Sequence, residues 1–435
     1  MRFALPLAAL FVSLGSATAA DNWPSFRGPT GDGRSDSKNL VSAWSETENI
    51  RWKAPIHGKG WSSPVVWGDQ VWLTTSEEVK GTGLVDKKIA GSNPAVKVEK
   101  VTFFAVCVDR KSGKVLHDIK LLEEKDPQFC HDFNSYATPT PVIEEGRVWC
   151  HFGQHGTWCL DTATGKVLWE RRDLKCNHFR GAGSSPIVYE NLLVLIFDGA
   201  DYQFVAALDK TNGSTVWKKD RNTKYPHDNG DNKKAYATPS VITVNGRPEL
   251  VCPSSEVTVA YEPKTGDELW RFNHLKKNSM NVGARTIAGH GHYYLLSGYT
   301  PMLMALKQGG TGLLPKEGVT WSLDKSVPSR PSLLLVEDLL FMISDTGFLT
   351  CVEAKTGKVL WSERLNGEYS ASPIVANGLI YLPNQTGKTT VVKASREFEP
   401  VAVNELKDGC MASPAVSGDA ILLRTKTHLY SIGKR

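Results

Sequence analysis

A phrase built around Thr-Gly and a tryptophan recurs along this chain. It reads "EAKTGKVLWSERL" at residues 353–365, related segments begin at residues 161, 209 and 262, and a looser copy begins at residue 109. Self-similarity at a spacing of about 40 to 50 residues is typical of propellers, solenoids and other repeat arrays. This repeat constrains the fold more than any other feature of the sequence.

A second repeated feature divides the chain into units. A Ser/Thr-Pro step followed by an apolar run occurs six times, and Arg330-Pro331 and Arg285-Thr286 fill two further positions. Eight units leave about 50 residues for each, which suits a four-stranded propeller blade. The six steps begin at Ser63, Thr138, Ser185, Thr238, Ser372 and Ser413.

Each unit has the pattern of short strands joined by tight turns. In residues 373–383 two apolar runs flank Asn377-Gly378, and Asn-Gly between apolar runs is the strongest local signal for a β-hairpin. Helical periodicity is almost absent. The sequence therefore predicts an all-β protein, an eight-bladed β-propeller of four-stranded antiparallel blades.

The two ends of the chain predict that the ring is closed. The last unit has only three expected strands, and an unpaired segment, "ENIRWKAPI" at residues 48–56, precedes the first full unit. We expect this N-terminal strand to complete the last blade, because closure removes an exposed strand edge. The predicted layout is a signal peptide at 1–20, an extended segment at 21–48 and the propeller at 49–435, with an insertion at 83–100 in the first blade.

One tryptophan position recurs in six of the blades. A large aromatic side chain on the outer strand can pack against the neighbouring blade while its N–H finds an acceptor. We interpret these residues as structural packing groups between blades. They are Trp52, Trp169, Trp217, Trp270, Trp321 and Trp361.

The leader and the composition indicate an exported protein. Arg2, an apolar stretch and Ala17-Thr18-Ala19 are typical of a secretory signal, and no later segment is apolar enough to be a transmembrane helix. Lys plus Arg number 51 and Asp plus Glu 46, a net charge of +5 without a basic cluster, so nucleic acid is not an expected partner. We expect a periplasmic or secreted monomer.

Disulfides are permitted in such a compartment. Cys130 and Cys176 lie in equivalent connections of adjacent blades, and we prefer this pair. Cys150 and Cys159 flank a hairpin turn, where facing residues come within disulfide range, and are the second candidate. No Cys-x-x-Cys pair is present, so no metal site is predicted.

Three arginines form the candidate ligand site. Arg285 and Arg330 occupy the Ser/Thr position in consecutive blades, so we expect both at the rim of the central channel, with Arg180 on the same face. Guanidinium groups bind carboxylate, sulfate or phosphate in bidentate fashion, which predicts a ligand with an anionic group. The alternative is an internal partner, namely Asp345, Asp198 or Asp201.

The repeated phrase resembles the pyrroloquinoline-quinone-type (PQQ-like) β-propeller repeat, in "LDTATGKVLW", "LDKTNGSTVW", "YEPKTGDELW" and "VEAKTGKVLW". This family includes quinoprotein alcohol dehydrogenases and the outer-membrane assembly protein BamB. The segment "NWPSFRGPTGDG" resembles the leader of secreted, planctomycete-type members of unknown activity. The family's enzymes use an adjacent cysteine pair and a calcium ion; this chain has no Cys-Cys dipeptide, so no cofactor and no catalytic residue are predicted.

These observations favour a non-catalytic binding or scaffold propeller. The function implied is envelope protein assembly, or recognition of an anionic or polysaccharide ligand. The expected partner is an envelope or extracellular protein, or a polysaccharide. The alternative is a quinoprotein-type oxidoreductase that uses the central funnel with PQQ and calcium.

Overall fold

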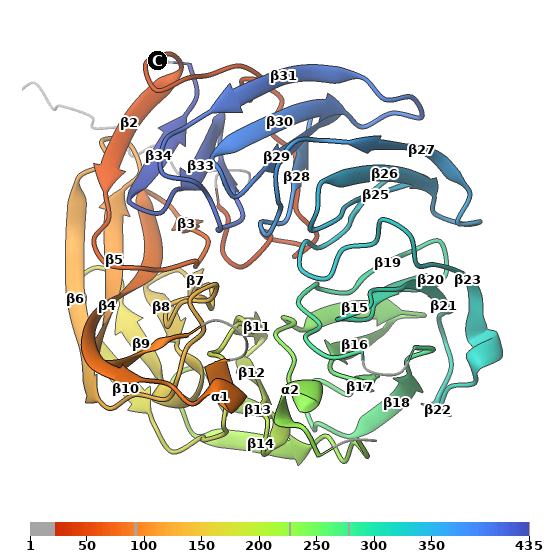
Figure 1. Ribbon diagram of the computed structural model, residues 1–435, viewed down its shortest axis with the longest axis horizontal. Coiled ribbons are helices and arrows are strands. Elements are labelled where there is room, and N and C mark those ends of the chain that lie inside the picture. The colour runs from red at the N-terminus through yellow and green to blue at the C-terminus, as the bar shows by residue number, and fades with distance from the viewer. Residues whose placement is uncertain (1–21, 91–93, 226–227, 277–278, 435) are drawn as a thin grey trace, which may run out of the picture.

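The computed structural model describes residues 22–90, 94–225, 228–276 and 279–434, and these residues form a ring of β-sheets. Eight four-stranded antiparallel units surround a central opening (Figure 1). The predicted eight-bladed propeller is confirmed. The predicted signal peptide at residues 1–20 lies outside the described residues.

Each of blades 1 to 3 is one four-stranded meander, with the shortest strand next to the opening (Figure 1). The predicted insertion at 83–100 falls at the end of the long β4–β5 hairpin, which carries helix α1 (Lys87–Ala90). Blade 1 contains β3 (Val65–Trp67), β4 (Gln70–Leu84), β5 (Val96–Asp109) and β6 (Val115–Lys125); blade 2 contains β7 (Val142–Glu144), β8 (Arg147–His151), β9 (Thr157–Asp161) and β10 (Val167–Arg171), with the 3-10 helix η2 (Gly153–His155); blade 3 contains β11 (Ile187–Tyr189), β12 (Leu192–Asp198), β13 (Gln203–Asp209) and β14 (Thr215–Asp220).

Blades 4 to 6 repeat this order, and blade 4 gains a fifth, parallel strand at its outer edge. Helix α2 (Gly230–Lys233) lies in the connection before blade 4, and the 3-10 helix η3 (Lys316–Gly318) precedes the last strand of blade 5. Blade 4 contains β15 (Ser240–Val244), β16 (Arg247–Pro253), β17 (Val257–Tyr261), β18 (Glu268–Asn273) and β22 (Gly312–Leu313); blade 5 contains β19 (Ile287–Gly289), β20 (His292–Leu296), β21 (Leu303–Lys307) and β23 (Val319–Leu323); blade 6 contains β24 (Leu334–Val336), β25 (Leu339–Ile343), β26 (Phe348–Glu353) and β27 (Val359–Arg364).

The N-terminal part of the chain completes blades 7 and 8. Strand β2 pairs antiparallel with β34, so the first and last parts of the chain lie side by side in blade 8 (Figure 1). The predicted closure by an N-terminal strand is confirmed. Blade 7 contains β1 (Arg34–Ser35), β28 (Ile374–Ala376), β29 (Leu379–Pro383), β30 (Lys388–Lys393) and β31 (Pro400–Glu405); blade 8 contains β2 (Ile50–Pro55), β32 (Ala415–Ser417), β33 (Ala420–Arg424) and β34 (His428–Ile432).

The repeated phrase forms the contact between neighbouring blades. Five of the six tryptophans donate their indole N–H to a backbone carbonyl in the turn of the next blade, at 2.8 to 3.3 Å. These bonds join Trp52 to Arg110, Trp169 to Lys210, Trp217 to Pro263, Trp321 to Ala354 and Trp361 to Ser395.

The glycine of the phrase belongs to the same contact. Gly357 has φ +71°, and a Cβ built on it would lie 2.6 Å from the ring of Trp321 in the preceding blade. Glycine is therefore required both by the turn conformation and by the ring above it. Gly113, Gly213 and Gly266 stand in the same relation to Trp52, Trp169 and Trp217.

Trp270 departs from this arrangement. Its side chain is fully buried and donates to the Glu249 carboxylate of its own blade at 2.7 Å. Blade 5 lacks the Thr-Gly turn, and its chain instead adds strand β22 beside Trp270. The acceptor is therefore supplied from within blade 4.

The cysteines do not form the predicted disulfides, since all eight are buried free thiols. Strands β8 and β9 pair Cys150 with Trp158 and Cys159 with Trp149. This register differs by one residue from the predicted one and directs the two thiols to opposite faces of the blade. Cys150 packs toward blade 1 and Cys159 toward blade 3. Cys130 and Cys176 are likewise unjoined.

Substitution of two glycines tests the blade contact. Gly357 and Gly378 have nearly equal φ values, +71° and +72°, but a Cβ at Gly378 would meet nothing within 4 Å. Gly378→Ala should lower the free energy of unfolding by about 1 kcal/mol through backbone strain alone. Gly357→Ala should lower it by a further 1–3 kcal/mol or so, because the methyl group displaces Trp321. Equal losses in urea titrations would contradict the proposed role of the ring.

Two N-terminal deletions test the closure of the ring. Removal of residues 22–56 takes away β2 and leaves β34 as an open edge, so we expect aggregation or loss of a single cooperative transition. Removal of residues 22–35 alone retains β2 and should leave a monomer. Light scattering and thermal unfolding measure both. A monomeric 22–56 deletion with unchanged melting would show that β2 is dispensable for closure.

Candidate ligand site in the central channel

The repeated Ser/Thr-Pro step forms a belt of hydrogen bonds around the channel. In each case a backbone N–H just before the innermost strand donates to the hydroxyl of the next blade, at 2.8 to 3.0 Å. We call these residues the hydroxyl belt. The bonds run from Ser63 to Thr140, Thr140 to Ser185, Ser185 to Thr238, Arg285 to Ser332, Ser332 to Ser372 and Ser372 to Ser413.

The belt corrects two predicted positions. Blade 2 contributes Thr140, not Thr138, and blade 6 contributes Ser332, not Arg330. Each predicted position lies two residues before the observed one. Side chains two residues apart point to the same face of a strand, so the alternation of apolar residues fits both positions equally well. Arg330 lies just outside the belt.

Two buried arginines bridge the positions where the belt is interrupted. Between blades 4 and 5, Nε of Arg285 donates to the Ser240 hydroxyl at 2.9 Å. Between blades 8 and 1, Nη1 of Arg424 donates to the Ser62 hydroxyl at 2.7 Å and to the Thr74 carbonyl at 2.8 Å. Arg424 was not predicted from the sequence, because a lone charged residue at the end of an apolar run, here "AILLR", belongs to no motif.

Residues 22–35 lie across one end of the central channel; we call this segment the wedge. Trp23 exchanges backbone hydrogen bonds with Val66 of blade 1, and Arg34 pairs with Val375 of blade 7. Between these points the fully buried Arg27 donates to the carbonyls of Leu333 at 2.7 Å and Pro373 at 3.0 Å. The wedge thus spans the channel from blade 1 to blade 7.

Arg285 faces the wedge. It is 7% exposed, and its Nη1 donates to the Phe26 carbonyl at 3.0 Å. Burial lowers its pKa to about 10, so the guanidinium remains charged at neutral pH. The prediction that Arg285 lies at the open rim with Arg330 is therefore wrong, because the wedge occupies the space in front of it.

The wedge borders a cavity of about 410 Å³ in the channel, which we call the cup. Phe26 of the wedge contributes to its lining, together with hydroxyl-belt residues from both halves of the ring. The wall carries Trp61, Phe133 and Tyr236 as aromatic groups. Cavities of this size accommodate small-molecule ligands.

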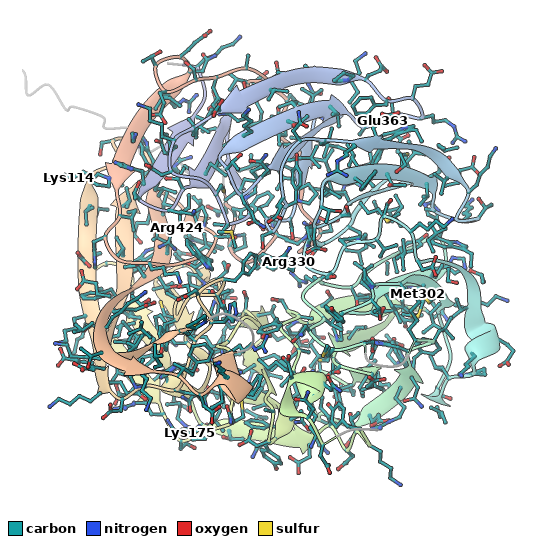
Figure 2. All side chains as sticks on the ribbon, viewed as in Figure 1. Lys114, Lys175, Met302, Arg330, Glu363 and Arg424 are labelled. Atoms are coloured by element: carbon teal, nitrogen blue, oxygen red, sulfur yellow. The ribbon has the colours of Figure 1, made fainter. Side chains whose placement is uncertain are left out.

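Arg330 crosses the mouth of the cup. It comes from the connection before blade 6, and its guanidinium lies 4.5 Å from the ring centroid of Phe133, which comes from the connection before blade 2. Blades 2 and 6 are opposite one another in a ring of eight, and Figure 2 shows Arg330 near the central opening. Its Nε also bonds the Asp345 carboxylate. Asp345 is thus the internal partner that was predicted as an alternative.

Arg180 and His131 line the same cup. Nη2 of Arg180 lies 3.4 Å from the Asp231 carboxylate, a long ion pair with an arginine side chain that is 28% exposed. The Phe133 N–H donates to Nδ1 of His131 at 3.1 Å, so the neutral ring carries its proton on Nε2. Burial and the neighbouring Arg180 lower the pKa of His131.

The other two predicted carboxylates serve the scaffold. Asp198 is fully buried and holds Arg221 through two bonds, of 2.6 and 2.9 Å. Asp201 accepts the N–H groups of Asn177 at 2.6 Å and Tyr202 at 2.7 Å, which is the chemistry of a turn. Neither bonds Arg180 or Arg330.

A buried lysine lies behind the cup wall. Lys234 is 1% exposed, and its Nζ donates to Nδ1 of His178 at 3.0 Å and to the Ala235 carbonyl at 3.0 Å. The ammonium also lies 4.4 Å from the ring centroid of Tyr236. Lys234 could not be predicted from the sequence, because a lone lysine in a connection has no distinguishing pattern.

The cup does not fit a calcium-bound quinone. Ca²⁺ takes six to eight oxygen ligands, with carboxylates prominent among them. No residue that lines the cup in the described part of the chain is Asp or Glu, and no trio of metal-ligating side chains was found in that part. Arg180 and Arg330 would instead repel the cation, so the residues present do not form such a site.

The comparison with known families agrees with this architecture. A family model described as "Outer membrane protein assembly factor BamB" matches residues 85–252 and 253–397, well over half of the chain. The chain belongs to this family. The PQQ-like resemblance drawn from the repeated phrase is thereby confirmed.

Individual relatives are distant. Tetrathionate hydrolase of Acidithiobacillus ferrooxidans is 22% identical over 80% of this chain and 68% of its own length. BamB of Shewanella oneidensis is 21% identical over 66% of this chain and 72% of its own length. A quinohemoprotein alcohol dehydrogenase of Pseudomonas putida HK5 superposes with a TM-score of 0.63 at 12% identity, covering 96% of this chain and 81% of that one. The last likeness shows the fold alone.

We expect the protein to lose stability in acid because several histidines are buried. Burial lowers the pKa of His151 and His274 to about 3 and that of His178 well below 6.5. The unfolded chain takes up these protons near pH 6.5 and the folded chain does not. The contribution of these histidines to the free energy of unfolding is therefore fully present above pH 6.5. It decreases as the pH drops from 6.5 toward 3, by about 1.4 kcal/mol per pH unit for each histidine.

Urea titrations between pH 7 and pH 5 measure this slope. Among the described residues His274 bonds the hydroxyls of Thr258 and Ser279, and His274→Gln should reduce the slope by about 1.4 kcal/mol per pH unit. Replacement of the exposed His290 by Gln is the control and should leave the slope unchanged. An equal slope in the wild type and His274→Gln would contradict the prediction.

Proposed function

We propose that this protein is a non-catalytic recognition propeller of the periplasm or cell exterior that binds a small anion in the cup. The observation that carries the proposal is the chemistry of the lining. Arg180, Arg330 and Nε2–H of His131 are hydrogen-bond donors, and no Asp or Glu among the described residues lines the cavity. A donor-rich site without carboxylates complements an acceptor-rich anion.

The hydroxyl belt adds further donors. Each belt hydroxyl accepts one backbone N–H through an oxygen lone pair. Thr140, Ser185 and Ser413 line the cup, and within the described chain their O–H groups bond no acceptor. A hydroxyl has one donor and two acceptor sites. The belt can therefore offer O–H groups to a ligand while it continues to join the blades.

The names of two relatives bear on separate parts of this proposal. Tetrathionate hydrolase acts, by its name, on a sulfur oxyanion. BamB is, by its name, an outer membrane protein assembly factor. For this chain we propose that the cup binds the anionic group of an envelope or extracellular partner, either a protein or a polysaccharide, and that the ring serves as a rigid monomeric scaffold.

Arginine substitution tests the site. Calorimetry with sulfate, tetrathionate and galacturonate as separate probes should detect binding of at least one anion, and the affinity should fall with added NaCl. Arg180→Gln with Arg330→Gln should weaken binding at least tenfold, because each lost charge-assisted bond contributes about 1.5–3 kcal/mol. Arg364→Gln is the control, since that guanidinium stacks on Phe348 at 5.1 Å in outer strand β27.

Two results would contradict this function. Failure of all three anions to bind the wild type would remove the anion site. Oxidation of an alcohol with an artificial electron acceptor, after addition of PQQ and calcium, would support the quinoprotein alternative instead.

A further inference from the structure

Lys234 is a buried cation without a carboxylate partner. None of the ion pairs in the described chain includes it, and its Nζ contacts only a neutral imidazole, a carbonyl and an aromatic face. An ammonium removed from water without a counter-ion is strongly unfavourable. Among the described residues the ammonium is therefore held by neutral groups, and the carboxylates of Asp198 and Asp231 act on it without an ion pair.

The acidic groups near Lys234 are engaged elsewhere. Asp198 is held by Arg221 at 2.6 Å, and Asp231 lies 3.4 Å from Arg180. On the remaining side, Cys176 lies 3.5 Å from Nε2 of His178. Burial raises the pKa values of Cys130 and Cys176 far above neutral, so neither thiol supplies a negative charge.

Tyr236 separates this charge from the cup. One face of its ring receives the Lys234 ammonium, and the residue lines the cavity. An anion bound against Tyr236 would lie about 8 Å from the ammonium, across a layer of protein where charges interact more strongly than in water.

We propose that Lys234 is the buried counter-charge of the cup and that anion binding is linked to protonation of Lys234. This inference rests on the proposed function, because it assigns a further residue to the same anion site. Lys234 touches no ligand; it acts through the Tyr236 ring as a specificity residue that favours negative over neutral ligands.

The linkage has a definite sign. Burial lowers the pKa of Lys234 to about 8 in the free protein. Below pH 8 the ammonium is already present and affinity is maximal. Above pH 8 a proton must bind together with the anion, so the affinity for the anion falls as the pH rises. The fall ends above the pKa of Lys234 in the complex and amounts to about tenfold in all.

Other titrating groups leave this pH window clear. The pKa of His131 is lowered from 6.5, and that of His178 lies well below it, so both rings are neutral from pH 7 upward. Burial raises the pKa of Tyr236 far above its usual value of 10. Among the groups named here, Lys234 is thus the one that changes charge between pH 7 and pH 9.5.

Calorimetry of the full-length protein tests the proposal with sulfate, tetrathionate and galacturonate as probes. At pH 9, titrations in two buffers of different ionisation enthalpy should show uptake of about 0.4 proton per bound anion, and at pH 7 almost none. Lys234→Met should bind with lower affinity at pH 7 and lose the pH dependence and the proton uptake. Its melting temperature should rise, because a buried unpaired charge is removed.

Lys233→Met is the matched control, since Lys233 is the neighbouring, half-buried residue at the end of α2. It should retain the wild-type pH profile. Anion binding without proton uptake at pH 9 would overturn the role of Lys234 and leave the proposed function intact. Absence of anion binding to the wild type would overturn both. The proton count uses the wild-type protein, so the outcome does not depend on whether the variant folds.

Discussion

The contact of one blade's tryptophan with the next blade's glycine is the interaction on which the ring depends. A blade alone has two apolar faces, and each must be covered by a neighbour. The indole covers the turn glycine, and its N–H satisfies a carbonyl of the same turn. Because this contact fixes the spacing of neighbouring blades, it also fixes the positions of the innermost strands and of the channel that they line.

The channel then receives a second, inner set of contacts. The hydroxyl belt joins the blades close to the axis, where the side chains are too short to pack across the opening. The wedge lies across one end of the channel and borders the cup. The wedge thus divides the channel, and the cup that remains has the size of a small-ligand cavity.

The sequence specified the ring more completely than the site. Turns, strand alternation and the tryptophan position are local patterns, so eight blades and their closure could be predicted. The position of Arg330 could not, because a shift of two residues leaves the alternation unchanged. Arg285 was placed correctly in the repeat but wrongly at the rim, since its surroundings depend on Phe26, which is 259 residues away in the chain.

Residues without a pattern were missed altogether. Arg424 and Lys234 acquire their roles from groups brought together by ring closure and by the connections, and neither belongs to a motif. Two of the three arginines of the predicted anion site, Arg180 and Arg330, line one cavity. Two of the three carboxylates named with this site bind elsewhere: Asp201 in a turn and Asp198 in a buried ion pair with Arg221.

Buried cations near the axis support the proposal that the channel binds anions, in a protein of nearly balanced charge. The net charge is only +5 over 435 residues. Yet Arg27, Arg285 and Arg424 lie buried near the axis, and in the described chain their guanidinium groups bond carbonyl and hydroxyl oxygens and form no ion pair with a carboxylate. Neutral acceptors hold most of the N–H groups and do not cancel the charges. The surrounding sheets have a low dielectric and concentrate such a field along the channel, which supports the proposed preference of the cup for anions.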